Sequence, residues 1–377
     1  MRVLFTQPYV PHYRVPLFDE LDARLRESGH SLIVASSVPR GSQALRRDNG
    51  TGAWSTIVPE FSVATPTGLL RYRRGLAGLI RTSDICVMEL DVGNLNAWSA
   101  AVRRRRRPLI LWGHGKSFTG PSDPASQRLK AVLAHHATHI MTYSESGRRH
   151  LVTLGVPADR VTAVGNSTDT HTLRRLSAAR RTRPLDRSEA FDGLLLRDRV
   201  VAAYVGGLDG DKRIPFLLEA ADAAHTVDPR FMLLVAGSGS DEDLVRRAVA
   251  GGHVAWIPRA DAAALVDIAL VSRTIWMPGR VGLIAVDAMA LGVPIVTTPF
   301  PYHAPEFEFL TPGRDVHLLP DTPAEFAKAA LLIAALPHTC ASVADLPAIS
   351  AVADSMCQVI DTCLSSRQPP ARALLRR

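Results

Sequence analysis

Three glycine-containing turns in the second half of the chain carry the residues best suited to chemistry. The segment Gly206–Arg213 reads GGLDGDKR and includes Lys212, while Gly237–Ser240 and Gly279–Gly282 each follow an apolar run. Glycine lets the backbone approach a ligand closely, and the N–H groups at the start of a helix attract an anion, as does a lysine. One such turn often serves only a strand-to-helix corner. Three of them from one sheet predict a site for a phosphate or diphosphate.

None of these turns has the spacing of the best known nucleotide motifs. No strand is followed by a G-x-G-x-x-G with an acidic residue about 20 positions later, and no G-x-x-x-x-G-K-[ST] loop is present. Asp209 and Asp211 have the D-x-D spacing of a metal-binding pair, but they directly precede Lys212 in the phosphate segment. We expect these two acids to cap the following helix, and the sequence predicts no bound metal.

A second group of candidates lies in the first half of the chain. His114 stands between two glycines rather than on an apolar helical face, which favours a functional role over a structural one. His12, Tyr13 and Arg14 follow the first expected strand, where a loop that contacts a second substrate would lie. Ordinary loop packing explains these three residues equally well.

Other polar residues have surroundings that indicate structural roles. His135, His136 and His139 suit a helix-to-strand junction better than a metal site, because apolar residues surround them. Ser144 and Glu145 are expected to cap the helix that starts beside them.

The candidates require elements that place them at the ends of strands. Both halves of the chain alternate short apolar runs with helical patterns. Several runs are apolar throughout, as in strands buried on both faces of a parallel sheet, and the helical patterns between them predict right-handed crossovers. The expected strands cover residues 2–7, 31–36, 84–90, 108–113, 139–144 and 161–165, and then 200–207, 231–237, 254–258, 274–278 and 294–298. The main expected helices cover residues 15–29, 214–226, 241–250, 261–270, 282–291, 323–336 and 341–364.

This alternation predicts an α/β fold of two Rossmann-like domains that face each other across a cleft. Residues 1–176 would form the N-terminal domain and residues 200–340 the C-terminal domain, with a polar, arginine-rich linker at 177–199 between them. The helix at 341–364 is expected to pack back on the N-terminal domain, and a basic tail at 365–377 would follow it. Ligands of open parallel sheets bind beyond the carboxyl ends of the strands, so the cleft is the expected site.

The composition limits the class of protein. The chain has 377 residues, of which 46% are hydrophobic and 21% charged, as in a globular protein with two domains of ordinary size. No apolar run reaches the roughly 20 residues that span a bilayer, and no signal peptide is evident. The four cysteines lack metal-type spacing and fit a reduced, cytoplasmic chain.

The net charge of +8 favours an anionic partner. Basic clusters lie at residues 71–74, 103–107 and 372–377, and apart from Tyr72 they contain no interleaved aromatic residue. Solvated arginines on helix ends and loops are therefore expected, and nucleic-acid binding is not. A peripheral contact of the first cluster with the anionic inner face of a membrane stays open.

The second half of the chain resembles the donor-binding domain of the GT-B glycosyltransferases, specifically the large retaining family 4 (glycosyl transferases group 1). The resemblance is carried by VGGLDGDK at 205–212, VAGSGSDEDL at 235–244 and PGRVGLIAVDAMALGVPIVTT at 278–298. In the first half QPYVPHYRVPLFDEL, WGHG and the segment 142–169 agree with it, so it extends over residues 1–320. It implies transfer of a hexose-type sugar from a nucleoside diphosphate to an acceptor hydroxyl, with retention at the anomeric carbon. The acceptor would be a glycan, a glycolipid or a natural product.

The resemblance also assigns roles to individual residues. Lys212 matches the lysine that contacts the donor diphosphate, Asp287 the acid that holds the ribose, and Arg259 lies in the segment that cradles the base. His114 lies in the loop that lines the sugar and acceptor cleft, so His114 and Lys212 are the expected catalytic residues. No cofactor is implied besides the donor itself, with a UDP-sugar expected rather than a GDP-sugar. The expected acceptor-binding residues are His12, Tyr13 and Arg14, and the expected donor-binding residues are Gly206, Gly207, Lys212, Arg213, Gly237, Gly239, Arg259, Gly279, Arg280, Val281, Gly282, Leu283 and Asp287.

Two side chains of the family pattern are absent. The family's arginine five residues before the lysine is Gly207, and the first glutamate of its E-x7-E pattern is Gly279. We hypothesise that Arg213 or Arg280 supplies the missing positive charge. The departures leave open a non-catalytic protein that binds nucleotide sugars, and the shared scaffold leaves open a nucleotide-sugar epimerase.

Overall fold

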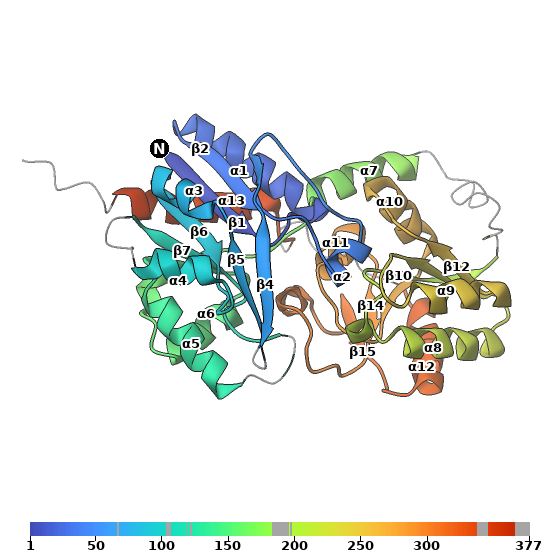
Figure 1. The fold of residues 1–377 in the computed structure, drawn as a ribbon. Coiled ribbons are helices and arrows are strands. Elements are labelled where there is room, and N and C mark those ends of the chain that lie inside the picture. Colours follow the sequence, from blue (N-terminus) through green and yellow to red (C-terminus); the bar gives the residue numbers. More distant parts are fainter. Residues whose placement is uncertain are drawn as a thin grey trace, which may run out of the picture. The chain divides into compact units, whose positions relative to one another are not determined.

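The computed structural model describes residues 1–65, 68–102, 107–118, 120, 123–182, 196, 198–337 and 346–365. The chain divides into two compact units, each built around a parallel sheet (Figure 1). Unit 1 comprises Met1–Pro39, Asp48–Asn166 and Ile349–Arg377, and unit 2 comprises Arg40–Arg47 and Ser167–Ala348. A short segment of the first half, residues 40–47, thus belongs to the unit that contains the three glycine turns. The α/β fold with two Rossmann-like parts is confirmed.

Unit 1 contains a seven-stranded parallel sheet in the order β3-β2-β1-β6-β7-β8-β9. The order reverses between β1 and β6, which is where a Rossmann-like sheet opens a crevice at its carboxyl edge. The strands are β1 (Arg2–Gln7), β2 (Ser31–Ser36), β3 (Ser55–Ile57), β6 (Ile85–Glu89), β7 (Leu109–Gly113), β8 (His139–Thr142) and β9 (Val161–Ala163).

The core of unit 1 has two layers because side chains of a strand alternate between the faces of the sheet. Val3 and Phe5 of β1 pack into a cluster with α1 (Val15–Glu27) and α13 (Ile349–Ser365), whereas Leu4 packs into the cluster on the other face. The two helices of the first cluster lie side by side although they come from opposite ends of the chain (Figure 1). The remaining helices of unit 1 are η1 (His12–Arg14), α3 (Leu76–Thr82), α4 (Leu95–Val102), α5 (Pro124–His135), α6 (Glu145–Thr153) and η2 (Ala158–Arg160).

An antiparallel hairpin of β4 (Glu60–Thr65) and β5 (Gly68–Arg73) extends from unit 1, and the sequence did not predict it. Arg73 at its base is 1% exposed and forms ion pairs with Glu60 at 3.0 Å and Glu89 at 2.8 Å. Glu89 ends β6 and also accepts hydrogen bonds from Thr6 and Asn94. The expectation of solvated arginines on helix ends and loops is therefore wrong for Arg73, which a two-carboxylate network holds in the interior.

Unit 2 contains a six-stranded parallel sheet in the order β12-β11-β10-β13-β14-β15. Here the order reverses between β10 and β13. The strands are β10 (Val200–Val205), β11 (Phe231–Ala236), β12 (Val254–Ile257), β13 (Thr274–Met277), β14 (Ile295–Thr297) and β15 (Val316–Leu318). The helices are α2 (Ser42–Leu45), α7 (Thr170–Thr182), η3 (Gly210–Lys212), α8 (Ile214–Val227), α9 (Glu242–Ala248), η4 (Val249–Gly251), α10 (Ala262–Val271), α11 (Ile284–Leu291), η5 (Pro305–Phe309) and α12 (Pro323–Ala335).

Local sequence signals explain where several of these helices begin. Proline stands in the first turn of α1, α5, α8 and α12, where its missing N–H is not needed. Asp123, Ser144 and Asp261 are N-caps whose side chains accept a hydrogen bond from the helix backbone. The predicted cap by Ser144 is thus confirmed, while Glu145 pairs with Arg148 at 3.0 Å.

The structure changes two details of the chain organisation. Helix α7 continues to Thr182, so residues 177–182 of the predicted linker are helical. The C-terminal helix begins at Ile349, later than the predicted residue 341. Residues 183–195, 103–106 of a basic cluster and the basic tail from 366 onward lie outside the described residues. Within the described part of the chain, no helix has the length and apolar character needed to cross a bilayer.

Candidate functional site

The loops after β10 and β13 meet at the carboxyl edge of the unit 2 sheet. The Lys212 Nζ donates a hydrogen bond to the carbonyl oxygen of Arg280 at 2.6 Å, and the Arg280 N–H donates to the carbonyl oxygen of Asp211 at 2.9 Å. These contacts place the lysine beside the first turn of α11, since a Cβ atom at Gly282 would lie 4.0 Å from its Nζ. The reversal of strand order therefore brings together two of the three glycine turns.

Gly279 permits this meeting because it has no side chain. A Cβ atom at residue 279 would lie 2.7 Å from the carbonyl carbon of Lys212 and 2.8 Å from its Cα, and it would overlap the carbonyl oxygen of Asp211. Atoms this close cannot coexist without displacement of one backbone segment. The glutamate that the family pattern places here is excluded by the fold of this chain.

Lys212 is partly buried among charges of both signs. The pKa of the Lys212 ammonium is lowered to about 8, chiefly by burial. The like charges of Arg280 and Arg46 add to this lowering, whereas the carboxylates of Asp211 and Asp209 act in the opposite direction. The ammonium is thus charged at neutral pH but held in surroundings that disfavour the charge. An anionic ligand at this position would relieve that cost.

The N–H groups of the loop after β13 are not all free for a ligand. Arg280 N–H is taken by Asp211, and Val281 N–H donates to Nδ1 of His303 at 3.1 Å. In this structure these two amides are therefore already hydrogen-bonded within the protein, and their binding of an anion stays a prediction. Gly282 and Leu283 have no acceptor for their N–H groups within the described part of the chain, and they stand directly before α11. At this corner, fewer backbone N–H groups are therefore open to an anion than the sequence predicted.

His303 is a member of this site that the sequence reasoning missed. Its ring stacks on Phe307 with 4.0 Å between ring centres, and burial, aided by Lys212 and Arg280, lowers the pKa of His303 to about 4. A neutral ring with Nδ1 as acceptor carries its proton on Nε2. The sequence signal for His303 is its position shortly after the strand that ends at Thr297, at the edge of the sheet that also carries Lys212.

The charged residues around Lys212 form ion pairs that differ from the prediction. Asp209 pairs with Arg46 at 2.7 Å and Asp211 with Arg280 at 3.4 Å, so neither acid caps a helix through its side chain. The prediction that they cap the next helix is wrong, because two arginines compete for their carboxylates. In the described residues, no three His, Cys, Asp or Glu side chains gather as a metal site would require.

The sequence suggested Arg213 or Arg280 as the substitute for the missing family arginine, and the structure adds Arg46, to which the sequence assigned no role. The Arg213 guanidinium binds Asp321, Thr298 and the carbonyl oxygen of Pro278, and it lies over the Phe216 ring. The positive charge of Arg213 is therefore already engaged within the protein and is not available to a ligand. Arg46 reaches the site from residues 40–47 and its Nε lies 3.7 Å from where a Cβ of Gly207 would stand. The place of the missing family arginine is thus occupied in space by a residue distant in sequence.

The other glycines of the predicted donor set serve close backbone packing. Gly206 and Gly237 have φ of +154° and +151°, and a Cβ at Gly237 would overlap the carbonyl oxygen of Gly206. A Cβ at Gly239 would similarly collide with the backbone of Leu208. The loops after β10 and β11 are therefore packed directly on each other, which positions the loop that carries Lys212. Arg259 lies exposed after β12, the strand next to β11.

Asp287 lies on the first turn of α11 and is partly buried. Its Oδ1 accepts a hydrogen bond from the Thr168 hydroxyl at 2.5 Å. Burial raises the pKa of the Asp287 carboxyl to about 6, although the Thr168 bond acts to lower it. Its second oxygen has no partner in the part of the chain that the structure describes. A carboxylate with one satisfied and one open oxygen suits a ligand hydroxyl.

The candidates of unit 1 lie at the carboxyl ends of β1, β7 and β8. His114 follows β7 with an exposed side chain, and its ring lies 4.9 Å from Tyr143 and 5.5 Å from Phe118. His12 is exposed and Tyr13 is 38% exposed, whereas Arg14 is buried. His135, His136 and His139 bind backbone carbonyls or a threonine at a helix-to-strand junction, as predicted.

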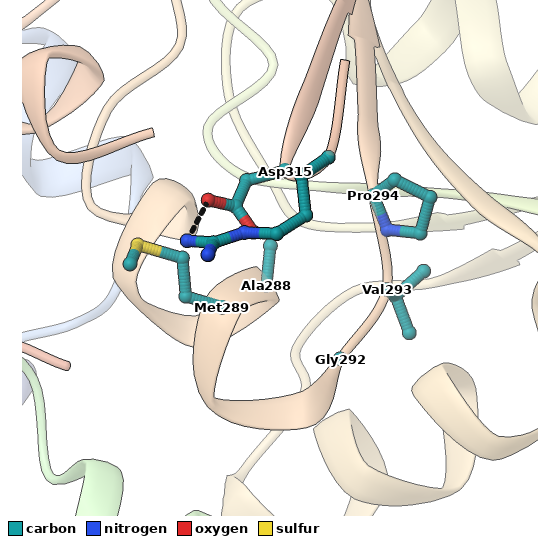
Figure 2. A pocket seen from close by; sticks show the side chains of 7 residues that line it. Ala288, Met289, Gly292, Val293, Pro294 and Asp315 are labelled. Carbon is teal, nitrogen blue, oxygen red and sulfur yellow. Dashed lines mark hydrogen bonds and ion pairs between the residues drawn. The ribbon is translucent and has the colours of Figure 1, made fainter. Parts of the chain in front are cut away.

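A small hollow of unit 2 lies at the opposite edge of the sheet, at the amino ends of β14 and β15 (Figure 2). Its lining includes Met289, Val293 and Pro294, and the Arg314 and Asp315 side chains form an ion pair at 2.8 Å beside it. Among the residues drawn, none has a nucleophilic side chain, and the one carboxylate, that of Asp315, is paired with Arg314. The residues of unit 2 that are suited to binding an anion therefore lie at the carboxyl edge of its sheet, not at this hollow.

Two family models match the sequence. The model of the glycosyl transferases group 1 matches residues 199–335, and the model of the glycosyl transferase 4-like domain matches residues 18–167. No curated protein matches the sequence.

Solved structures similar to this chain share its fold at low sequence identity. Anabaena HepE in complex with UDP is 15% identical with a TM-score of 0.59, and the match covers 97% of this chain and 98% of that chain. Sucrose-phosphate synthase from Thermosynechococcus elongatus is 15% identical with a TM-score of 0.60, over 97% of each chain. UDP-GlcNAc 2-epimerase from Methanocaldococcus jannaschii is 11% identical with a TM-score of 0.60, over 96% of this chain and 100% of that chain. These likenesses identify the fold as GT-B.

Gly279→Ala should destabilise the protein by about 1–3 kcal/mol, because the new methyl group must displace the backbone at Asp211 or Lys212. Gly279→Glu, which restores the family residue, should fare no better. Gly282→Ala is the matched control, since its Cβ meets only the flexible end of Lys212 at 4.0 Å. Thermal denaturation measures all three variants. A Gly279→Ala protein as stable as Gly282→Ala would contradict the packing argument.

Asp287→Asn should stabilise the protein at pH 7.5. The folded-state pKa of about 6 lies above the ordinary value of 3.8, so stability is lost as pH rises through this range and the carboxyl ionises. Removing the charge should recover on the order of 1–3 kcal/mol, after allowance for partial exposure. The gain should shrink toward pH 5, where wild-type Asp287 is protonated in the fold. Melting curves of both proteins at the two pH values test this, and an equal difference at both would refute it.

Proposed function

We propose that this chain transfers a sugar from a nucleoside diphosphate to an acceptor hydroxyl, with unit 2 as the donor-binding part, because the glycosyl transferases group 1 model matches residues 199–335, the glycosyl transferase 4-like model matches residues 18–167, and the fold is GT-B. The single observation that carries the proposal is the position of the Lys212 ammonium, bonded to the Arg280 carbonyl at 2.6 Å and adjacent to the first turn of α11. A cation and two open N–H groups at the start of a helix suit the two phosphates of a donor.

The proposed chemistry rests on charge that develops as the donor breaks apart. Departure of the nucleoside diphosphate places negative charge on its phosphate oxygens. Lys212 and the N–H groups of Gly282 and Leu283 would stabilise that charge more strongly in the transition state than in the bound donor. Because Lys212 uses one hydrogen for the Arg280 carbonyl, two remain for phosphate oxygens.

Arg46 and Arg280 complete the positive surroundings of the proposed diphosphate. Both act on Lys212 as like charges, and both are paired with loop acids, Asp209 and Asp211. Exposed ion pairs of this kind are worth about 0–1 kcal/mol, so a diphosphate can take over the arginines at small cost. Arg46, rather than Arg213, is therefore the proposed substitute for the missing family arginine.

A UDP-sugar is the proposed donor. HepE has been solved with UDP and also with UDP-glucose, and its fold extends over nearly the whole of this chain. Asp287 would accept a ribose hydroxyl through its open oxygen, and the exposed loop around Arg259 would lie against the base. Transfer would need no metal, since both acids of the D-x-D pair are already engaged by arginines.

Unit 1 would bind the acceptor and supply His114. Its exposed ring stands at the carboxyl end of β7 beside Tyr143 and Phe118. Retention at the anomeric carbon is proposed from the family resemblance, with attack by the acceptor on the face that the diphosphate leaves. For a lipid-linked acceptor, the exposed apolar face of hairpin β4–β5, with Phe61, Val63 and Tyr72, is the proposed contact with an anionic membrane on the cytoplasmic side.

A nucleotide-sugar epimerase is the second candidate, because the M. jannaschii UDP-GlcNAc 2-epimerase shares the fold at a TM-score of 0.60. An epimerase converts its donor without an acceptor. A transferase needs an acceptor for turnover beyond slow hydrolysis. The two candidates therefore differ in a way that one assay separates.

The decisive test incubates the protein with UDP-glucose, UDP-galactose and UDP-GlcNAc, with and without a panel of sugar acceptors, and follows UDP release. UDP should raise the melting temperature of the wild-type chain, because a ligand of the folded state stabilises it. Acceptor-dependent release that survives EDTA supports the proposal, and the product's anomeric configuration by NMR reports retention. Epimerised donor without acceptor would establish the rival, and the absence of any UDP binding would overturn both.

Arg46→Met should weaken UDP affinity by about 10-fold, which corresponds to roughly 1.4 kcal/mol of charge interaction with the diphosphate. Arg213→Met should change UDP affinity by less than about 2-fold, because its guanidinium serves Asp321, Thr298 and Pro278. Isothermal titration at low and physiological salt measures both. Melting temperatures without UDP identify any loss of fold. The assignment of Arg46 fails if Arg213→Met has the larger effect on affinity.

A further inference from the structure

Arg14 of unit 1 is a buried cation that forms no ion pair with a carboxylate of the described residues. Its residue is 7% exposed and it is the N-cap residue of α1, a thirteen-residue helix. The Nη2 group donates to the Tyr143 hydroxyl at 2.9 Å, whereas Nη1 is buried and has no hydrogen-bond partner among the described residues. No acidic residue occupies the first turn of η1 or of α1. A buried charge in this condition is costly to the fold unless something binds it.

Aromatic rings surround the Arg14 guanidinium. Its central carbon lies 4.4 Å from the centre of the Trp112 ring, 5.3 Å from Tyr143 and 5.7 Å from Tyr13. Burial acts to lower the pKa of Arg14, but the charges of the Tyr143 and Tyr13 phenols and the side-chain hydrogen bonds of Arg14 with both of them raise it above its ordinary value, so the group is fully charged. Contacts with ring faces compensate part of the lost hydration and leave the Nη1 hydrogens unbonded.

A second buried donor without a partner among the described residues is Nε1 of the Trp112 ring, over which the Arg14 guanidinium lies. Indole and guanidinium N–H groups can only donate, so each of the two requires an acceptor. The start of α1 adds a positive dipole end beside a positive side chain, which is the reverse of what a helix N-terminus favours. A neutral water would fill the hydrogen bonds but leave the charge.

The two donors lie where unit 1 would bind its substrate. Trp112 is the second-last residue of β7, the strand that leads to His114, and Tyr143 directly follows β8. The His114 ring lies 4.9 Å from Tyr143, which itself holds Arg14. Tyr143 thus contacts both Arg14 and the exposed His114 of the proposed acceptor site.

We propose that Arg14 and Trp112 form an oxyanion subsite that binds a carboxylate or phosphate group of the sugar acceptor. The word acceptor in this statement rests on the proposed function, whereas the oxyanion does not. Of the three aromatic neighbours only Tyr13 is substantially exposed, at 38%, against 2% for Trp112 and 7% for Tyr143. A rotation of the Tyr13 side chain is therefore the smallest movement that opens the subsite to a ligand.

The test titrates the full chain with three probes in the presence of saturating UDP, which fills the phosphate site of unit 2. Methyl glucuronide carries a carboxylate, glucose 1-phosphate carries a phosphate, and methyl glucoside is the neutral match. Tryptophan fluorescence and melting temperature report binding. We expect at least one anionic probe to bind 10-fold or more tightly than methyl glucoside, and the better of the two identifies the anionic group of the acceptor. Equal affinity for all three overturns the subsite.

Variants assign the effect to the two donors. Trp112→Phe keeps the ring and removes only the unbonded N–H, so it should weaken the anionic probe 5-fold or more with little loss of stability. Trp54→Phe is the matched control, because the Trp54 Nε1 already donates to Asp19 at 2.8 Å. It should lower the melting temperature and leave probe affinity unchanged. Arg14→Lys keeps the charge but loses the fork, and should also weaken binding 5-fold or more.

The outcomes separate this proposal from the proposed function. Should Arg14→Lys not fold, Trp112→Phe alone decides, and wild-type affinity for the anionic probe in that variant overturns the subsite. A protein that binds UDP but shows no anionic preference refutes the subsite and leaves the donor site intact. A protein that binds the anionic probe without UDP affinity supports the subsite and refutes the donor site.

Discussion

The hydrogen bond from the Lys212 ammonium to the Arg280 carbonyl oxygen sets the geometry of the candidate donor site. It joins the loops that follow β10 and β13, the two neighbouring strands at which the order of the unit 2 sheet reverses. The bond exists because residue 279 has no side chain, so the two backbones can touch. A cation is thereby fixed at the start of α11, where the open N–H groups of Gly282 and Leu283 point in the direction that an anion requires.

The charges around this bond explain why the site lacks two residues of the family pattern without losing its character. Arg46 stands in space where the pattern has an arginine at position 207, and Gly279 replaces a glutamate that the close loops cannot accommodate. His303, kept neutral by burial and by neighbouring cations, holds the Val281 amide and stiffens the loop. Compared with the predicted site, fewer backbone amides and more side-chain cations face the ligand position.

The sequence predicted what depends on local pattern and on the topology of parallel sheets. Both Rossmann-like parts, the strands of the two large sheets except the short β3 and β15, and the meeting of Lys212 with the Gly279 turn follow from apolar runs and from the rule that strand ends share an edge. It could not predict Arg46, because a contact across more than 160 residues leaves no periodic signal. Hairpin β4–β5 was missed although Phe61, Val63, Leu70 and Tyr72 alternate along it, because its exposed strands lack the continuous apolar runs of the two parallel sheets. Arg73 looked like a surface residue because its partners, Glu60 and Glu89, lie on other strands.

The cations near Lys212 in unit 2 and Arg14 in unit 1 differ in which groups compensate their charge when no ligand is bound. In unit 2 the arginines near Lys212 are paired with Asp209 and Asp211, so a ligand must exchange one anion for another. Such exposed pairs are weak, about 0–1 kcal/mol each, and the exchange favours a diphosphate that brings more charge than either carboxylate. In unit 1 the partners of Arg14 among the described residues are aromatic rings and the Tyr143 hydroxyl, so no described carboxylate has to leave. The cost there is the movement that admits a ligand, and the fold bears the unpaired charge until it arrives. An exchange centre suits a donor that must leave again as a diphosphate, whereas an unpaired buried cation suits selection of one kind of acceptor over another.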